Sequence, residues 1–414
     1  MTRVGEVAKD HLLDVALACR PVYTRDEEVA AFELLLQGDR ASQGASLSDI
    51  EASNPAILET YTQVFQGGRM HRVPSFLKIT DELILAPGLP ELPKENYILE
   101  IPGDILLTAE RMERLTNLAR HGYRLALAGF DPDKEKLDPL LDVVHIVKVD
   151  TRDMDDEALL RATDKLLACG VEMLADNLDC RERFLHCREL GFDYFQGDFL
   201  SKPSPAKDKR ISGNKVLLLQ LLSELHNPDT SPARLEEIAL KDAKLTYHIL
   251  KAVNSVSLGL LREVNSISHA IFLLGLEKIK RYVKLFLVGS EQDKPEALTR
   301  GMLVRGRMCE VLAEIAGRDN PVDHFIAGLL SQLDALMDIP MPELLEQVPL
   351  NHTVKDALLH RSGSLGEVLR EVELYEKGHF GDLTLLEDRR FYETAYRHST
   401  TWARQAQQTM RYES

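Results

Sequence analysis

Short apolar segments alternate with helical stretches over the first half of the chain, and this alternation limits the fold more than any other feature. Eight segments have the length and residue types of buried strands. They cover Leu12–Ala18, Val29–Leu36, Val73–Ile79, Tyr97–Ile101, Arg124–Ala128, Val143–Val149, Val171–Ala175 and Phe192–Gln196. Helices such as Ala109–His121, ended by Gly122, lie between them. Periodicity indicates an α/β fold, and the number of strands favours a TIM-like barrel with outer helices.

The first two segments flank the polar sequence TRDEE and predict a hairpin. We expect its first strand to end at Arg20-Pro21. The following sequence, residues 47–68, reads as helical.

The stretch Gly191–Pro203 (GFDYFQGDFLSKP) ends the alternating region. A buried run leads to a turn at Gln196-Gly197, where glycine permits a tight bend. The sequence then becomes polar and basic over residues 204–213, and it is helical beyond them. We therefore predict a barrel domain at 1–203, a linker at 204–213 and an all-α helical domain at 214–414.

The helical domain has several expected helix boundaries. Ser231-Pro232 is a good start for a helix over Pro232–Leu240. Near the end of the chain, an amphipathic helix carries the single tryptophan, Trp402, which we expect to be buried against the bundle.

Composition excludes two classes of partner. The 414 residues carry a formal net charge of −16, which argues against coating nucleic acid because that role needs a positive field. No apolar run reaches the roughly 18 residues of a membrane helix. The N-terminus lacks a cleavage site, so we read it as mature protein, and the five cysteines form no C-x-x-C pair. These features predict a cytoplasmic protein with reduced thiols and no membrane contact.

Polar side chains gather where the predicted strands end. Chemistry in such barrels takes place at the carboxyl ends of the strands. The residues there are Glu33, Lys78, Glu100, Lys148, Asp176, Asp179 and Gln196. On pattern alone, Glu33 and Glu100 are equally compatible with ordinary acids at strand ends. Lys148 is harder to dismiss, because a lone lysine is rare in an apolar strand.

Four motifs resemble those of EAL domains, the cyclic di-GMP phosphodiesterase fold. AFELLLQG resembles the E-A-L strand, YILEIPGD the E-L-T-E strand, and HIVKVD the K-I-D strand. The closing stretch resembles D-Y-x-Q-G-Y-x-F-S-K-P. The resemblance covers roughly residues 10 to 203. It implies that Glu33, Glu100, Lys148, Asp179 and Gln196 are retained from a catalytic site, with Lys148 in the place of the catalytic lysine.

Other positions depart from the EAL pattern. The resemblance implies two divalent cations held by carboxylates and an Asn, but Lys78 replaces that Asn, and Ala128 and Gly129 replace the paired acids. The second acid of E-L-T-E is Gly103, and Asp176 replaces a Glu. Without these ligands the remaining acids cannot hold a metal pair. We therefore predict no metal, no cofactor and no hydrolysis, with Lys78 acting as a counter-charge to Glu33 or Glu100.

The second domain resembles HDOD domains over Asp242–Gly275. Such domains look like HD-family phosphohydrolase bundles that lack the metal site. Ser331-Gln332 stands where His-Asp would supply metal ligands. The dipeptide Asp323-His324 precedes an apolar helix, and we read it as part of the start of that helix.

An EAL domain followed by an HDOD domain is the arrangement of a family of bacterial signalling proteins. The resemblance implies a non-catalytic regulator that acts through protein–protein contacts in cyclic di-GMP-linked control of motility or biofilm. Two alternatives stay open: a metal-independent cyclic di-GMP receptor using Arg20, Gln196 and Pro203, and an active phosphodiesterase. EAL-like barrels commonly pair, so a homodimer fits this reading. The protein partners cannot be identified from the sequence.

Overall fold

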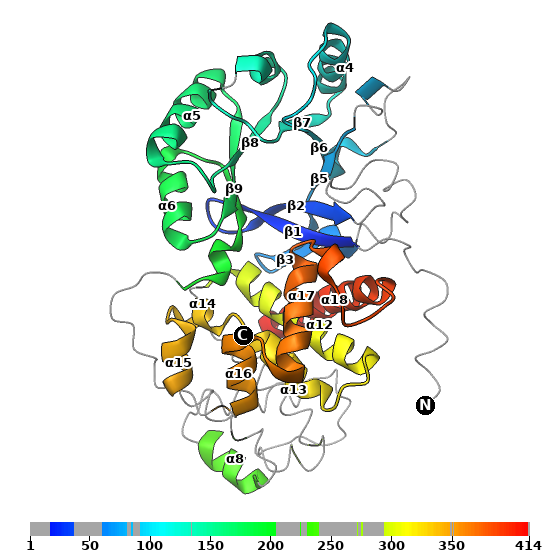
Figure 1. The fold of residues 1–414 in the computed structure, drawn as a ribbon, viewed down its shortest axis with the longest axis vertical. Coiled ribbons are helices and arrows are strands. Elements are labelled where there is room, and N and C mark those ends of the chain that lie inside the picture. Colours follow the sequence, from blue (N-terminus) through cyan, green and yellow to red (C-terminus); the bar gives the residue numbers. More distant parts are fainter. Residues whose placement is uncertain are drawn as a thin grey trace. The chain divides into compact units, whose positions relative to one another are not determined.

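The computed structural model describes two compact units. It covers residues 17–36, 60–80, 84–85, 92–133, 135–203, 224, 230–239, 271, 275, 294–347, 350 and 352–412. The first unit comprises Met1–Lys202 with Glu371–Thr400, and the second comprises Pro203–Arg370 with Thr401–Ser414. The first contains the predicted barrel, and the described part of the second is helical (Figure 1).

Eight strands close into a barrel in the first unit, which confirms the predicted fold class. The strands are β1 (Leu17–Thr24), β2 (Val29–Leu36), β5 (Ser75–Lys78), β6 (Tyr97–Ile101), β7 (Arg124–Leu127), β8 (Ile146–Asp150), β9 (Glu172–Leu178) and β10 (Tyr194–Gly197). Their order around the barrel is β1-β10-β9-β8-β7-β6-β5-β2. β1 runs antiparallel to both of its neighbours, and the other pairs are parallel.

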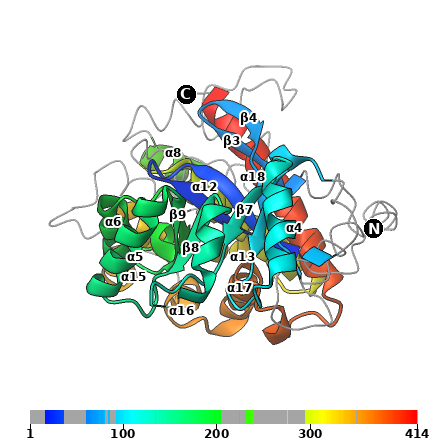
Figure 2. The ribbon, with the colours of Figure 1, turned by 90° about the horizontal axis from the view of Figure 1, so that it is seen from above.

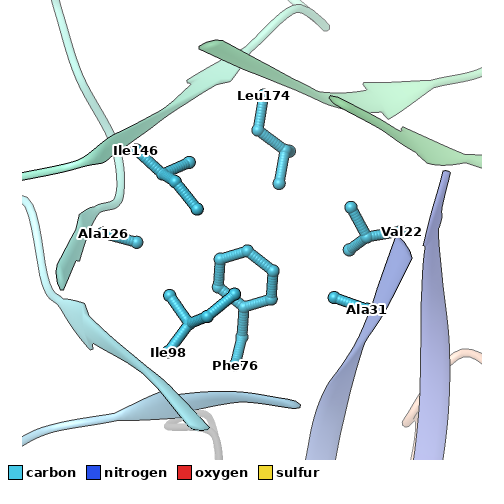
Figure 3. Packing of buried hydrophobic residues seen from close by; sticks show 7 residues of the cluster. All are labelled: Val22, Ala31, Phe76, Ile98, Ala126, Ile146 and Leu174. Atoms are coloured by element: carbon cyan, nitrogen blue, oxygen red, sulfur yellow. The ribbon is translucent and has the colours of Figure 1, made fainter. Parts of the chain in front are cut away.

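One apolar layer fills the barrel interior. Each of seven strands contributes one buried side chain, and Tyr194 of β10 packs against them. The seven residues are Val22, Ala31, Phe76, Ile98, Ala126, Ile146 and Leu174 (Figure 3). Because side chains alternate between the two faces of a strand, the residue two positions along each strand also points inward. This layer therefore determines which side chains form the next one.

The first strand of the hairpin ends later than we expected, because β1 runs through Arg20-Pro21 instead of ending there. The earlier part of the predicted strand, residues 12–16, lies outside the described residues. Pro21 is opposite Phe32, whose N–H donates to Pro74 O at 3.0 Å. Since Phe32 turns its N–H towards β5, Pro21 lies at a non-hydrogen-bonded position of the β1–β2 ladder. β10 pairs with β1 only at Tyr23 and Thr24, so the missing N–H of Pro21 breaks no ladder bond.

The prediction of helix up to residue 68 was wrong for its last part. Residues Gln63–Gln66 (β3) and Arg69–Arg72 (β4) form a two-stranded hairpin. Gly67 and Gly68 both have positive φ, 60° and 80°. A two-residue turn of this kind matches the twist of a hairpin, and glycine adopts it without strain. The earlier part, residues 47–59, lies outside the described residues.

Three α-helices lie outside the barrel strands (Figure 2). They are α4 (Ala109–Arg120), α5 (Asp156–Cys169) and α6 (Arg181–Leu190). The side chain of Asp155 caps α5 by accepting the N–H of Ala158 at 2.7 Å, and Gly170 ends it in the left-handed region. Short 3₁₀ segments complete the connections: η1 (Lys94–Asn96), η2 (Glu135–Asp142) and η3 (Asp198–Ser201).

The described part of the second unit is helical, as predicted. It contains α8 (Pro232–Ala239), α12 (Glu296–Ile315), α13 (Pro321–Leu330), α14 (Leu333–Met337), α15 (Met341–Gln347) and α16 (His352–His360). α12 and α13 pack closely at Gly328, where a Cβ would lie 2.7 Å from Arg305 O. Of the predicted HDOD signature, Asp242–Gly275, only Ile271 and Gly275 fall among the described residues.

The C-terminal segment, residues 371–400, belongs to the first unit, whereas we had placed it in the domain 214–414. It contains the end of α17 (Gly363–Glu376), the 3₁₀ segment η5 (Phe380–Asp382) and the start of α18 (Arg390–Tyr412). Buried tyrosines attach it to β1: Tyr375 Oη donates to Leu17 O at 2.6 Å, and Tyr396 Oη to Cys19 O at 3.2 Å. The rest of α18 lies in the second unit, where Trp402 is half-buried and meets the edge of Phe325.

A search of the described residues for membrane spans found no helix of sufficient length and apolar character to cross a bilayer.

Gly197 is predicted to be much less replaceable than other glycines with positive φ. A Cβ at Gly197 (φ 146°) would lie 2.2 Å from Leu178 O, whereas a Cβ at Gly170 (φ 70°) would meet nothing within 4 Å. We expect Gly170→Ala to cost about 1 kcal/mol from backbone strain. Gly197→Ala should cost ~3 kcal/mol or more, because it adds a backbone clash. Urea denaturation of both variants, with hydrogen exchange of the barrel strands, measures the difference; equal costs would contradict it.

Candidate functional site

A second interior layer lies above the apolar one, at the carboxyl ends of the parallel strands. Each member is two residues from a member of the apolar layer, so it points to the same side of its strand. Its residues are Arg20, Glu33, Lys78, Glu100, Ala128, Lys148, Asp176 and Gln196. We call this set the polar layer. Nearly all of the predicted site residues thus come together because of one regular feature of the barrel.

Glu33 is the centre of the polar layer. Its Oε1 accepts a hydrogen bond from Lys148 Nζ at 3.0 Å. Its Oε2 accepts from Gln196 Nε2 at 3.1 Å and from Arg20 Nη1 at 3.2 Å. Arg20 is directly opposite Glu33 in the β1–β2 hairpin. Side chains from three other strands, β1, β8 and β10, therefore hold the carboxylate of Glu33, which lies on β2.

Lys148 joins Glu33 to Glu100. Its Nζ also donates to Glu100 Oε2 at 2.8 Å, and it lies 5.4 Å from the centroid of the Phe76 ring. All three charged side chains are buried, with 4%, 9% and 1% of the Lys148, Glu33 and Glu100 side chains exposed. A charge removed from water in this way is tolerated only when paired.

Arg20 extends the network to Asp176. Its Nη2 lies 3.5 Å from Asp176 Oδ1. The Arg20 side chain is 28% exposed, more than those of Glu33 and Asp176. Arg20 therefore connects the buried ion pairs to solvent.

The charges shift the titration of the polar layer. Burial alone would raise the pKa of Glu33, but the positive charges of Lys148 and Arg20 outweigh it and lower the pKa to about 2. Burial likewise opposes the charged form of Lys148, but Glu100 and Glu33 raise its pKa above the ordinary value. The pKa of Asp176 is raised, chiefly by burial. Glu33 and Lys148 are thus a stable ion pair at neutral pH.

Three predicted residues behave differently from our expectation. Lys78 is half-buried and forms no ion pair with Glu33 or Glu100, both of which are described, because Lys148 takes that role. Asp179 is exposed, and its side chain interacts with Cys180. It follows the last residue of β9, Leu178, and so does not continue the series of inward-facing positions to which Asp176 belongs. Pro203 is half-buried and is the first residue of the second unit.

The residues present do not fit a pair of divalent cations. In the polar layer, three acids (Glu33, Glu100, Asp176) are matched by three bases (Arg20, Lys78, Lys148), which leaves no excess negative charge. Gly103 touches the loop after β7: a Cβ there would lie 2.4 Å from Ala128 O and 2.9 Å from Gly129 O. An acid at 103 would need this loop to move. Among the residues that the structure describes, no group of three or more His, Cys, Asp or Glu is placed to hold a metal ion.

In the second unit, Ser331 and Gln332 stand where we expect the HD metal ligands to be missing. Ser331 and Gln332 follow α13 and are buried, and Ser331 Oγ donates to Gly328 O at 2.7 Å. Arg305 Nη1 donates to Ser331 Oγ at 3.1 Å. His324 lies in the first turn of α13, as predicted, with its ring nitrogens 3.3 Å from Asn320 O and 3.2 Å from Ser364 Oγ. Burial lowers the pKa of His324, so its ring is neutral.

Sequence reasoning missed how Arg20 and Asp176 are used. We singled out Arg20 as a ligand contact and Asp176 as a degenerate position, whereas both belong to the ion-pair network. A spacing of two residues from the apolar position of each strand would have identified the whole polar layer.

One family model and two known proteins match the chain. Residues 215–360 match the family model described as HDOD domain. The chain is 26% identical over 394 residues to the protein YuxH of Bacillus subtilis, covering 92% of this chain and 95% of that one. It is 28% identical over 376 residues to the cyclic di-GMP phosphodiesterase CdgJ of Vibrio cholerae, covering 89% and 86%. The chain therefore contains an HDOD domain at residues 215–360.

Solved structures of EAL proteins are similar to a little under half of the chain. The EAL domain of FimX from Pseudomonas aeruginosa bound to c-di-GMP is 18% identical, with 48% of this chain and 94% of that chain covered and a TM-score of 0.34. The PaMucR phosphodiesterase in complex with c-di-GMP is 15% identical, with 47% and 93% covered and a TM-score of 0.35.

Replacing Lys148 should destabilise the barrel strongly at neutral pH. Lys148→Met leaves Glu33 and Glu100 buried without a cation, which should cost about 3–5 kcal/mol at pH 7. Lys78→Met is the matched control, because Lys78 is in the same layer but pairs with neither acid. Urea denaturation should give a cost under about 1 kcal/mol for the control. If the two variants lose similar stability, the assigned role of Lys148 is wrong.

The pH dependence of stability tests the same ion pair. The pKa of Glu33 lies at about 2 in the folded protein against an ordinary 4.5. Its contribution, about 3 kcal/mol, is therefore present above pH 4.5 and lost as the pH falls towards 2. Lys148→Met should lack this contribution, so its deficit against wild type should shrink as the pH falls through this window. Denaturation curves between pH 7 and 2.5 measure the effect, and a constant deficit would contradict it.

Proposed function

We propose that this protein is a regulator in cyclic di-GMP-linked signalling whose barrel does not hydrolyse the dinucleotide. The observation that carries the proposal is the charge balance of the polar layer, in which the acids Glu33, Glu100 and Asp176 are matched by the bases Arg20, Lys78 and Lys148. Lys78 adds a positive charge at the position where the EAL resemblance implies a metal-binding Asn, and like charges repel a cation. The output is then contact with protein partners.

Cyclic di-GMP enters this proposal through the resemblance to EAL domains and through the name of one relative. CdgJ of Vibrio cholerae, which aligns with most of the chain, is named a cyclic di-GMP phosphodiesterase. At 28% identity a catalytic site can be lost while the fold is retained. The balanced charges of the polar layer favour that outcome here.

A metal-independent cyclic di-GMP receptor is the second candidate. Two features of the polar layer favour it. The buried Gln196 Oε1 has no hydrogen-bond partner among the residues that the structure describes, so it can accept from a ligand N–H. Arg20 is partly exposed and carries the positive charge that an anionic phosphate would need. Pro203 remains a candidate contact from the sequence.

Titration calorimetry with cyclic di-GMP, first in magnesium and then in EDTA, separates these functions. A regulator that works only through proteins should show no heat of binding in either buffer. Micromolar binding that survives EDTA would establish the receptor. Binding or turnover that requires magnesium would overturn the proposal and establish the phosphodiesterase.

If binding survives EDTA, Arg20 should carry a large part of it. Arg20→Ala should then weaken the affinity at least tenfold, because a charge-assisted phosphate contact is lost. Arg152→Ala is the control: Arg152 is an exposed arginine paired with Asp150 at 2.6 Å, outside the polar layer. Equal affinities of the two variants would exclude Arg20 as a ligand contact.

A further inference from the structure

The C-terminal segment, residues 371–400, contacts β1 through buried tyrosines. Tyr375 and Tyr396 donate to the carbonyl oxygens of Leu17 and Cys19, as described above. The rings of these two tyrosines lie 5.4 Å apart, and Tyr396 stacks on Tyr61 at 5.7 Å. Buried carbonyls need donors, so these hydroxyls satisfy two backbone groups at the start of β1.

A buried carboxylate of the C-terminal segment makes a second contact with the first unit. Glu393 of α18 is completely buried and accepts a hydrogen bond from Tyr61 Oη at 2.7 Å. Arg397 Nε donates to the same oxygen at 3.1 Å. Tyr61 precedes β3 in the chain, so the segment is attached to the barrel at two places that are distant in sequence.

Internal hydrogen bonds keep the segment in shape. Glu371 accepts from the backbone N–H groups of Thr384 and Leu385, at 2.9 and 3.1 Å, and from Tyr392 Oη at 2.6 Å. This carboxylate therefore closes the connection between α17 and α18.

The anchored carbonyls lie directly before Arg20. Cys19 O, held by Tyr396, belongs to the peptide unit that precedes Arg20, and Arg20 bonds Glu33 across the hairpin. An arginine whose backbone shifts by about 1 Å loses the geometry of its ion pairs. The Arg20 side chain is partly exposed, so fewer neighbouring side chains hold it in place. Its position therefore depends strongly on the position of its own backbone.

We infer that Tyr375 and Tyr396 are positioning residues for Arg20, acting through the backbone of β1, so that the C-terminal segment controls the polar layer. The inference rests on the proposed function only in treating Arg20 as a ligand contact. The placement of Arg20 can be measured without any ligand, so this inference and the proposed function can fail separately.

The test is the Nε–H signal of Arg20 in full-length protein labelled with ¹⁵N-arginine, assigned by loss of the signal in Arg20→Lys. Tyr396→Phe and Tyr375→Phe each remove one hydroxyl and keep the ring. In the double variant we expect the Arg20 signal to move towards that of an exposed arginine and its proton to exchange at least tenfold faster.

Tyr392→Phe is the matched control. Tyr392 lies on α18 and is equally buried, but its hydroxyl bonds Glu371 inside the segment and not β1. It should lower the melting temperature without moving the Arg20 signal. An unchanged Arg20 signal in the folded double variant, or an equal change in Tyr392→Phe, would overturn the inference. Should the double variant not fold, each single tyrosine variant gives the same comparison.

Discussion

The ammonium group of Lys148 lies between two buried carboxylates, and the upper half of the barrel depends on this arrangement. Each of the three charges would be costly to bury alone, and together they are stable because attraction at about 3 Å exceeds the loss of hydration. Arg20 and Gln196 complete the coordination of Glu33. The barrel thus closes its interior with an ion pair at the level where the EAL resemblance implies metal ions.

The polar residues of the two units are neutralised in different ways. In the barrel, acids remain but are neutralised by bases of the same layer. In the helical unit, the predicted ligand positions hold Ser331 and Gln332, and the neighbouring His324 is uncharged and hydrogen-bonded.

Much of the fold could be predicted from the sequence, because buried strands are short apolar runs between helices. The segment Tyr97–Ile101 was predicted to the residue. The site residues were predicted as a group since parallel strands end at one rim. Which of these residues pair with one another was not predicted correctly. Whether Lys148 or Lys78 reaches Glu33 depends on strand register and side-chain direction. Asp179 was misplaced for the same reason. The contacts of Tyr375 and Tyr396 with β1 join residues more than 350 positions apart, which no local pattern reveals.

The barrel unit is made of both ends of the chain, and this affects how the protein is made in the cell. β1 leaves the ribosome early, but its partner Tyr375 follows 358 residues later. At 5–20 residues per second the first strand waits roughly 20 to 70 s for the segment that completes it. During that time the carbonyls of Leu17 and Cys19 lack their tyrosine donors. A chain whose translation stops before residue 371 would therefore have all eight barrel strands but neither of these tyrosine donors.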